Sequence, residues 1–277
     1  AGRGQLRSHR RLGMLRDGRG RRLLRDRSEG WLLWHRSPRG APRDVRMPVS
    51  PLRQRAFAEG IGTAFLVAAV IGSGVAAQRL SPSDVGLQLL ENSLATGAVL
   101  AALIVALQPV SASFNPVVTL AERALRVVTT KEAALLIASQ LAGAGVGAVA
   151  ANLMFGLRPV TVAAQTRGGP GVWLAEMIAT LGLVLIIFGA GRAGRGSQVG
   201  YLVGAYITGA YWFTSSTSFA NPAVTVARTL SDTFAGIAPS SAPLFVLMQL
   251  LGGAAAVALV KTLYQQPAVV AADLAAA

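Results

Sequence analysis

The sequence lacks cysteine altogether and has almost no histidine. Without cysteine, the 277-residue chain can form neither a disulfide framework nor a thiolate metal site. Its two histidines, His9 and His35, both lie near the start of the chain. The remainder therefore lacks the commonest general base and metal ligand, and most hydrolytic, redox and zinc chemistries have no residues to carry them. We expect no metal site, no cofactor and no enzymatic activity.

Charge is also scarce over most of the chain, although the net charge is +14. Residues 1–55 hold 16 of the 26 Lys and Arg residues and 4 of the 12 Asp and Glu residues, a net charge of +12. Residues 56–277 hold the other 10 and 8, a net charge of only +2. The strong positive charge is thus the property of a basic N-terminal tail, residues 1–55.

Residues 1–46 of this tail are rich in Arg and Gly, contain no Lys and show no sustained apolar period. Such a stretch buries too little apolar surface to offset its ordering entropy, which predicts disorder. Two alternatives are a nucleic-acid-binding arm, aided by Trp31 and Trp34, and a segment attracted to anionic lipid headgroups. Because no folded binding module accompanies the charge, we expect no nucleic-acid partner. Met47 opens a phrase typical of a natural start, so residues 1–46 are a candidate for sequence outside the working protein.

The rest of the chain is rich in long apolar runs. A bilayer core of about 30 Å needs about 20 apolar residues in a helix, and windows this continuous are improbable in a soluble helical protein. The first window contains Glu59 and is too long for a cleaved signal peptide. We therefore predict a multi-pass protein of the lipid bilayer, and the Lys and Arg distribution places both termini on the cytoplasmic side of the inner membrane. Six windows meet or approach the required length, the fifth being short: 56–77, 86–107, 133–155, 172–190, 198–213 and 240–262.

The apolar body repeats itself. Three landmarks occur twice in the same order: Ala-Glu with a Thr four residues after the Glu, an Asn-Pro phrase, and Gln-Leu-x-Gly. The copies are 117, 106 and 109 residues apart: Glu59 and Glu176, Asn115 and Asn221, Gln140 and Gln249. Each half has three spans and one short helix, so the second half enters the membrane from the opposite side, as in inverted-repeat transporters. We expect one membrane domain at 56–262, with repeats at about 56–155 and 172–262, and a C-terminal tail at 263–277.

The Asn-Pro phrases predict two short helices. Asn is a preferred N-cap and Pro is favoured at the first helical position, so each phrase starts a helix, at 115–126 and 221–232. About twelve residues cannot span the bilayer, so each helix dips in and stops with its N-terminus near the midplane. There the two Asn amides offer N–H donors to a passing solute, and the positive helix ends repel cations. The phrases are Phe114-Asn115-Pro116-Val117-Val118-Thr119 and Ala220-Asn221-Pro222-Ala223-Val224-Thr225.

This arrangement resembles the aquaporin and glycerol-facilitator family, which is marked by two Asn-Pro-Ala phrases on re-entrant half-helices. The resemblance covers about residues 56–262. It implies an all-α bundle of six transmembrane helices and two half-helices, a passive channel for small neutral solutes, and a homotetramer of independent pores. It also implies that Glu59 and Glu176 are buried carboxylates that brace the two loops. The alternative role for a carboxylate inside a membrane is a proton relay.

The chain departs from the family at its constriction. The first phrase has Val117 where the family has Ala, and Val224 stands where an Arg usually follows the second phrase. Arg228 lies one helical turn further on and is not assumed to take its place. The His of water-selective members is absent from the body. Small or apolar residues at the constriction imply a wide opening without Arg, which favours neutral solutes larger than water. By the resemblance, the constriction residues are Ala95 or Thr96, Gly209, Ser218 and Val224.

The second phrase in context, YWFTSSTSFANPAVTVARTLSDTFAGIAP, resembles a bacterial branch of the family associated with arsenic resistance. This implies arsenous acid, methylated arsenicals or glycerol-like molecules as solutes, with water passage also open. Two other functions remain open. An ion-coupled secondary transporter also uses inverted repeats and broken helices, and its ionisable candidates are Glu59, Glu91 and Glu176, of which Glu91 has no assigned role. The other is a structural membrane protein with a closed pore.

Overall fold

The computed structural model describes residues 14–16, 22–24 and 50–264, in two compact units, Ala1–Pro48 and Val49–Ala277. In the first unit, strands β1 (Met14–Arg16) and β2 (Arg22–Leu24) form an antiparallel pair with Leu15 opposite Leu23. Residues 1–46 were predicted to be disordered, so the sequence did not predict this strand pair. The remainder of that prediction, and the C-terminal tail from residue 265 onward, fall outside the described residues.

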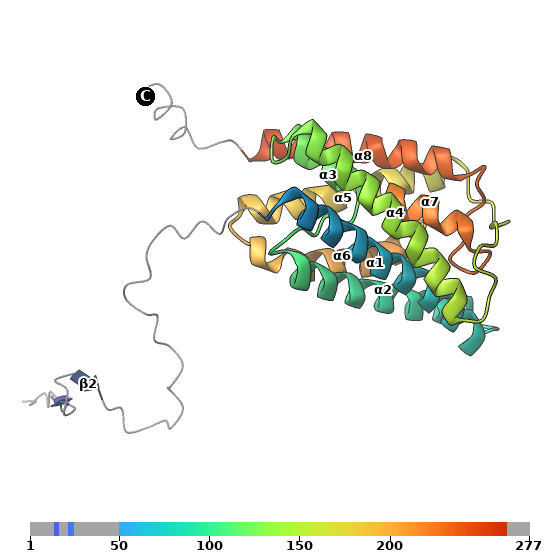
Figure 1. Ribbon diagram of the computed structural model, residues 1–277, viewed down its shortest axis with the longest axis horizontal. Helices are drawn as coiled ribbons and strands as arrows, with labels where there is room; N and C mark the ends of the chain where they lie inside the picture. Colours follow the sequence, from blue (N-terminus) through green and yellow to red (C-terminus); the bar gives the residue numbers. More distant parts are fainter. Residues whose placement is uncertain (1–13, 17–21, 25–49, 265–277) are drawn as a thin grey trace, which may run out of the picture. The chain divides into compact units, whose positions relative to one another are not determined.

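In the residues that the structure describes, the second unit is built from helices alone, which confirms the predicted all-α fold (Figure 1). Five of its six long helices are long and apolar enough to cross a membrane, and α6, with 15 residues, follows directly on the 3₁₀ turn η1. The elements are α1 (Leu52–Leu80), α2 (Val85–Leu107), α3 (Pro116–Ala124), α4 (Thr130–Met154), α5 (Pro170–Arg192), η1 (Gly196–Gln198), α6 (Val199–Phe213), α7 (Pro222–Ala227), η2 (Arg228–Leu230) and α8 (Ala242–Leu263). The predicted end of the basic tail at residue 55 thus falls inside α1.

Local sequence signals explain where several helices begin. Helix α4 starts with a capping box, because the Thr129 hydroxyl accepts from the Glu132 N–H while the Glu132 carboxylate accepts from the Thr129 N–H. Asp84 caps α2 by accepting from the Leu87 N–H at 2.9 Å. The short helices α3 and α7 follow an Asn cap and have Pro at their first position, as the phrases predicted.

The packing of the long helices is repeated, once in each half. Helix α1 lies along α4 in the first half and α5 lies along α8 in the second, whereas α2 lies along α6 and so joins the two halves. Glycines allow the closest approaches. A Cβ added at Gly143 of α4 would overlap the carbonyl oxygen of Gly60 in α1, and one at Gly252 of α8 would overlap that of Met177 in α5. Small residues at such crossings let helix backbones come together, as is typical of membrane helices.

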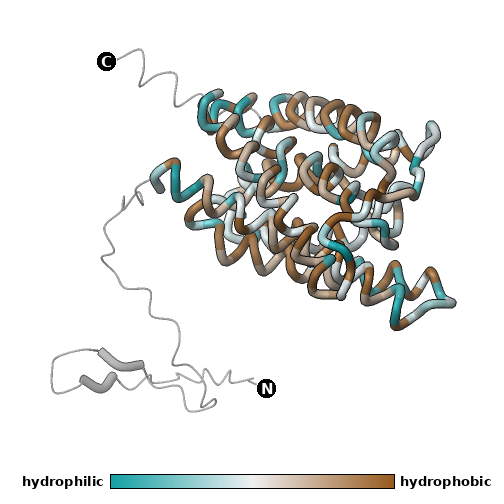
Figure 2. The backbone as a smooth tube through the Cα atoms, turned by 45° about the vertical axis from the view of Figure 1, so that its right-hand side comes forward, coloured by the Kyte–Doolittle hydropathy of each residue, from teal (hydrophilic) through white to brown (hydrophobic). Residues whose placement is uncertain are grey.

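The helix ends define two faces of the second unit. The terminal face holds the start of α1 at Leu52 and the end of α8 at Leu263, and the opposite face, which holds residues 155–169, is the loop face. Apolar residues predominate along the helices, and polar residues gather near the two faces (Figure 2). The end of α3 lies beside the start of α4 at the terminal face, whereas η2, which continues α7, is hydrogen-bonded to residues 161 and 163 of the loop face. The two half-helices therefore start inside the bundle and run outward in opposite directions.

Candidate functional site

The two half-helices meet at their Asn residues. The Asn115 side-chain amide donates to the carbonyl of Ala220 at 2.7 Å, and the Asn221 amide donates to the carbonyl of Phe114 at 2.8 Å. Each Asn oxygen caps its own helix, Asn115 by accepting from the Val117 N–H at 3.0 Å and Asn221 in the same manner. Each half-helix is thus tied to the residue that precedes the other, which fixes the two Asn side chains next to one another.

The backbone is strained immediately before each Asn. Phe114 has φ of 48° and Ala220 has φ of 47°, in the left-handed region that non-glycine residues seldom adopt. Such a conformation costs about 1–3 kcal/mol and persists only where the surroundings hold it. Because it occurs at the same place in both halves, it belongs to the turn that brings each chain segment to its Asn.

A buried carboxylate holds each strained turn. Glu59 of α1 and Glu176 of α5 are both 0% exposed, and each accepts two backbone N–H bonds from the turn and one bond from a Gln amide. The donors to Glu59 are Ser113 N (2.8 Å), Phe114 N (2.7 Å) and Gln140 Nε2 (2.8 Å), together with the Ser111 hydroxyl (2.5 Å). The donors to Glu176 are Phe219 N (2.9 Å), Ala220 N (3.0 Å) and Gln249 Nε2 (2.6 Å). These contacts satisfy buried N–H groups that would otherwise lie unpaired in a membrane.

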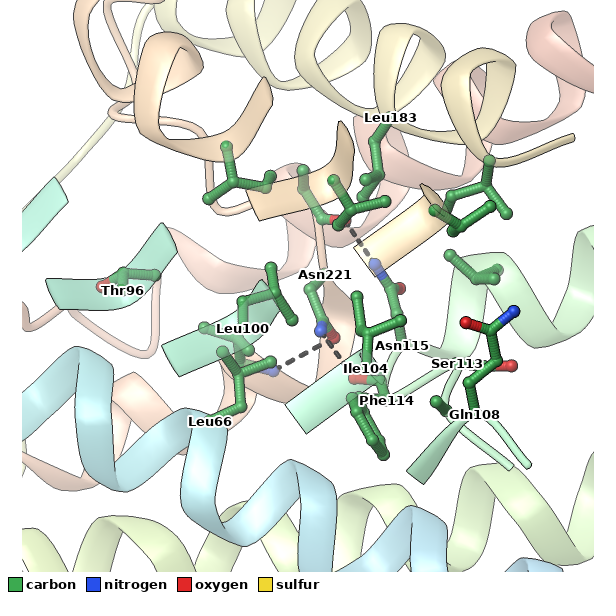
Figure 3. A pocket seen from close by; sticks show the side chains of 18 of the residues that line it. Leu66, Thr96, Leu100, Ile104, Gln108, Ser113, Phe114, Asn115, Leu183 and Asn221 are labelled. Carbon is green, nitrogen blue, oxygen red and sulfur yellow. Dashed lines mark hydrogen bonds between the residues drawn. The ribbon is translucent and has the colours of Figure 1, made fainter. Parts of the chain in front are cut away.

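A cavity of about 340 Å³ runs between the half-helices and four long helices. Helices α1 and α5 contribute two pairs whose members are each 117 residues apart, Leu66 with Leu183 and Val70 with Ile187. Figure 3 shows Thr96, Leu100, Ile104 and Gln108 following one another along one wall, with the two Asn side chains near its middle. A second stripe, also at every fourth residue, comes from α6, which packs beside α2: Val199, Val203, Ile207 and Tyr211. Most of the wall is therefore apolar, with amide donors at its centre.

Comparison with known proteins assigns this geometry to a family. The profile of the family described as major intrinsic protein matches residues 47–218. The chain belongs to the major intrinsic protein family. Aquaglyceroporin AqpS of Rhizobium meliloti (strain 1021) is 46% identical over 215 residues, which cover 77% of this chain and 91% of that protein. The X-ray structure of the aquaglyceroporin from Plasmodium falciparum covers 81% of this chain and 100% of its own, with a TM-score of 0.58 and 16% identity, which shows likeness of fold.

As a major intrinsic protein, the chain is a multi-pass membrane channel for small neutral solutes and not an enzyme. The family resemblance inferred from the doubled Asn-Pro phrase is thereby confirmed. Within the part of the chain that the structure describes, no group of three or more His, Asp or Glu side chains is arranged to hold a metal ion.

Five of the predicted site residues line the channel cavity: Asn115, Asn221, Thr96, Ser218 and Val224. Pro116, Val117, Pro222 and Ala223 are buried behind it, in the first turns of the half-helices. The larger side chain at Val117 is accommodated by α8, because a Cβ added at Gly253 would overlap the Val117 side chain. The departure from Ala at this position therefore alters packing against α8 and not the wall of the cavity.

Two predicted constriction residues require correction. Gly209 is exposed on the outside of α6, and among the described residues no atom lies within 4 Å of where its Cβ would be. The α6 stripe that faces the cavity passes through Ile207 and Tyr211, so Gly209 falls on the opposite side of the helix. Ala95 is half-buried and does not line the cavity, whereas its neighbour Thr96 does, and the Tyr211 hydroxyl lies 3.3 Å from the Thr96 hydroxyl.

The prediction of a constriction without arginine is not confirmed. Val224 does stand where the family usually has Arg, but Arg228 lines the same cavity one turn later. Arg228 is 2% exposed, its Nε donates to the carbonyl of Ala235, and its guanidinium carbon lies 3.4 Å from the centroid of the Phe219 ring. The signal available in the sequence was an arginine within an apolar half-helix, where an unpaired charge is costly unless it has a function or partners.

The cavity also has a polar mouth at the terminal face that no sequence motif predicted. Arg55, at the start of α1, lines this mouth and forms an ion pair of 2.9 Å with Glu132 at the start of α4. Glu122 of α3 lines it too and accepts from the Ser113 hydroxyl at 2.8 Å. Glu91, for which the sequence assigned no role, accepts from the Ser81 hydroxyl at 2.8 Å, where α1 passes into α2. It lies outside the cavity lining.

Proposed function

We propose that this channel passes uncharged solutes larger than water, such as glycerol, arsenous acid and methylated arsenicals, down their gradients, and that water passes as well. The observation that carries the proposal is the wall around position 224. Val224 is 4% exposed and lines the cavity together with apolar residues of α2 and α6. An apolar wall accommodates the carbon skeleton or methyl group of a solute, while a few donors bind its oxygens. The relative named aquaglyceroporin AqpS supports solutes of the glycerol class.

The central donors support passage of neutral molecules. A side-chain amide has two N–H groups, and each Asn donates one of them across the junction between the half-helices. The second N–H of Asn115 and of Asn221 is left to replace water around a solute oxygen. A cation would meet these donors and the positive end of α3 without an acceptor shell, so ions pay a desolvation cost that neutral solutes do not.

Stopped-flow permeability of the full chain in lipid vesicles tests the proposal. Glycerol and arsenous acid should cross faster than in empty vesicles, and water should cross too. Permeability to all three at the level of empty vesicles would contradict a channel function and favour the closed-pore alternative.

Replacing Val224 with arginine should reduce glycerol permeability by about tenfold, the discrimination that a few side-chain atoms in a pocket give, and water permeability by less. The longer side chain would fill the cavity wall and place a second guanidinium one turn from Arg228. Parallel stopped-flow measurements for glycerol and water provide the test. Val224→Ile, which keeps an apolar branched side chain, serves as the control. Equal loss for both solutes in a folded Val224→Arg protein would show that the wall at 224 does not select by solute size.

We further propose that both termini are cytoplasmic, in the inner membrane, and that the channel is a homotetramer of independent pores. The positive charge of residues 1–55 supports the orientation, because basic segments stay on the cytoplasmic side. The chain has no cysteine, so single substitutions can be labelled cleanly. Lys261→Cys at the terminal face should react with an impermeant maleimide only from inside, and Arg158→Cys at the loop face only from outside; the reverse pattern would contradict the orientation.

Mass analysis of the detergent-solubilised protein should give four chains.

A further inference from the structure

We propose that Glu122 is the residue that keeps anions out of the channel at the terminal face, so that solutes enter there only in uncharged form. The inference deepens the proposed channel function and rests on it. It concerns the ions of negative charge, which the donors at the centre of the cavity do not repel.

The centre of the cavity carries donors and positive charge. The remaining amide N–H groups of Asn115 and Asn221 and the positive end of α3 repel a cation, but they would bind an anion. Arg228 adds a guanidinium to the wall nearer the loop face. Glu59 and Glu176 do not line the cavity, and their oxygens accept hydrogen bonds from the turns behind it. Exclusion of anions therefore needs a further group along the path.

Glu122 supplies a negative charge on that path. Among the described residues that line the cavity, it is the sole acidic one. It lies seven residues after Asn115, which is about 10 Å along α3 at a rise of 1.5 Å per residue. Its carboxylate accepts from the Ser113 hydroxyl at 2.8 Å, a neutral donor that leaves the charge in place. Figure 3 shows Ser113 and Gln108 at the same end of the cavity, away from Thr96.

The other charged groups at this mouth form a pair of their own. Arg55 lines the mouth, and its Nη1 lies 2.9 Å from a carboxylate oxygen of Glu132. This ion pair is neutral as a whole, so the net charge of the mouth is that of Glu122. The sign of the charge that lines a narrow passage decides which ions enter it, because walls of low dielectric screen the charge poorly. An anion from the terminal face thus meets repulsion before it reaches the Asn amides.

The test is the ratio of nitrate to glycerol permeability of the full chain in vesicles at about pH 8, where carboxylates are ionised. Nitrate is a small anion with no neutral form at this pH, and K⁺ with valinomycin carries the balancing charge. Wild type should pass glycerol and admit nitrate only at the level of empty vesicles. Glu122→Gln, which keeps the shape and removes the charge, should raise the ratio by about tenfold, the order expected for one poorly screened charge near the path.

Glu91→Gln is the matched control. Glu91 also accepts from a serine hydroxyl at 2.8 Å, but it lies outside the cavity lining, so this change should leave the ratio as in wild type. Glu122→Asp keeps the charge and should still exclude nitrate. Gln108→Lys adds a positive charge to the same mouth at the end of α2, where a basic side chain suits the helix C-terminus, and it should raise the ratio with Glu122 in place.

An unchanged ratio in Glu122→Gln would overturn the inference, and so would nitrate entry through wild type as fast as through Glu122→Gln. An equal rise in Glu91→Gln would overturn it too, since the leak would then not depend on the mouth. If Glu122→Gln does not fold, Gln108→Lys decides the matter alone, and an unchanged ratio there would count against the inference. Wild-type glycerol permeability at the level of empty vesicles would instead refute the proposed channel function, so the two failures are distinguishable.

Discussion

Replacing Glu59 with leucine should abolish both the folded channel and its solute flux. The change would remove the acceptor of four donors in the membrane interior: the N–H groups of Ser113 and Phe114, the Gln140 amide and the Ser111 hydroxyl. Each such loss costs about 1–3 kcal/mol, and the strained turn at Phe114 would lose what holds it. We expect that the variant no longer elutes as a single peak in size-exclusion chromatography. We also expect its glycerol permeability to fall to the level of empty vesicles.

The repeat supplies the control for this experiment. Glu176→Leu should have the same effect, because Glu176 holds the turn at Ala220 through equivalent bonds. Glu59→Gln, which keeps one acceptor oxygen, should be less damaging than Glu59→Leu. A folded Glu59→Leu protein with wild-type flux would show that the carboxylate is not required to hold the turn.

Replacing Gly143 with alanine should lower the free energy of unfolding by at least about 3 kcal/mol, the upper range for overpacking. The added Cβ would overlap a backbone atom, the carbonyl oxygen of Gly60, and not a side chain that can turn away. Helices α1 and α4 would have to separate along the contact that positions Glu59. Thermal unfolding in detergent measures the effect as a lower midpoint.

Gly145→Ala, two residues further along α4, is the matched control. Among the described residues, no atom lies within 4 Å of the position of its Cβ. Alanine is also a better helix former than glycine by about 1 kcal/mol, so this variant should be as stable as wild type or slightly more stable. Similar midpoints for Gly143→Ala and Gly145→Ala would contradict the close backbone packing of α1 on α4.

The architecture could be predicted from the sequence because the same landmark residues occur once in each half. The doubled Asn-Pro phrase predicted both helix starts, which the structure finds at Pro116 and Pro222. The helix ends were less predictable, since α3 stops at Ala124 and α7 at Ala227, before the expected ends at 126 and 232. Where a half-helix stops depends on the segments that cover it, and these come from distant parts of the chain.

For a comparable reason, residue spacing could not predict which residues line the constriction. Counting back from Asn221 to α6 crosses residues 214–221, where Thr217 and Ser218 have φ of 62° and 49°. The path through such a segment is set by its contacts, so the count selected Gly209, whereas the cavity is lined by Ile207 and Tyr211. Arg228 reaches the cavity because the chain tightens into η2 and returns to bring the Ala235 carbonyl to its Nε. That return is not encoded in any local pattern.

Glycerol flux into vesicles, with and without an imposed pH or Na⁺ gradient, tests the central claim most directly. The structure has Glu59 and Glu176 fully buried and bonded to backbone N–H groups, which argues against either as a coupling site. A passive channel predicts flux that rises in proportion to glycerol concentration, stops at equal concentrations inside and outside, and ignores both ion gradients. Saturable uptake that accumulates glycerol against its gradient when a pH or Na⁺ gradient is applied would contradict the account and identify a coupled transporter.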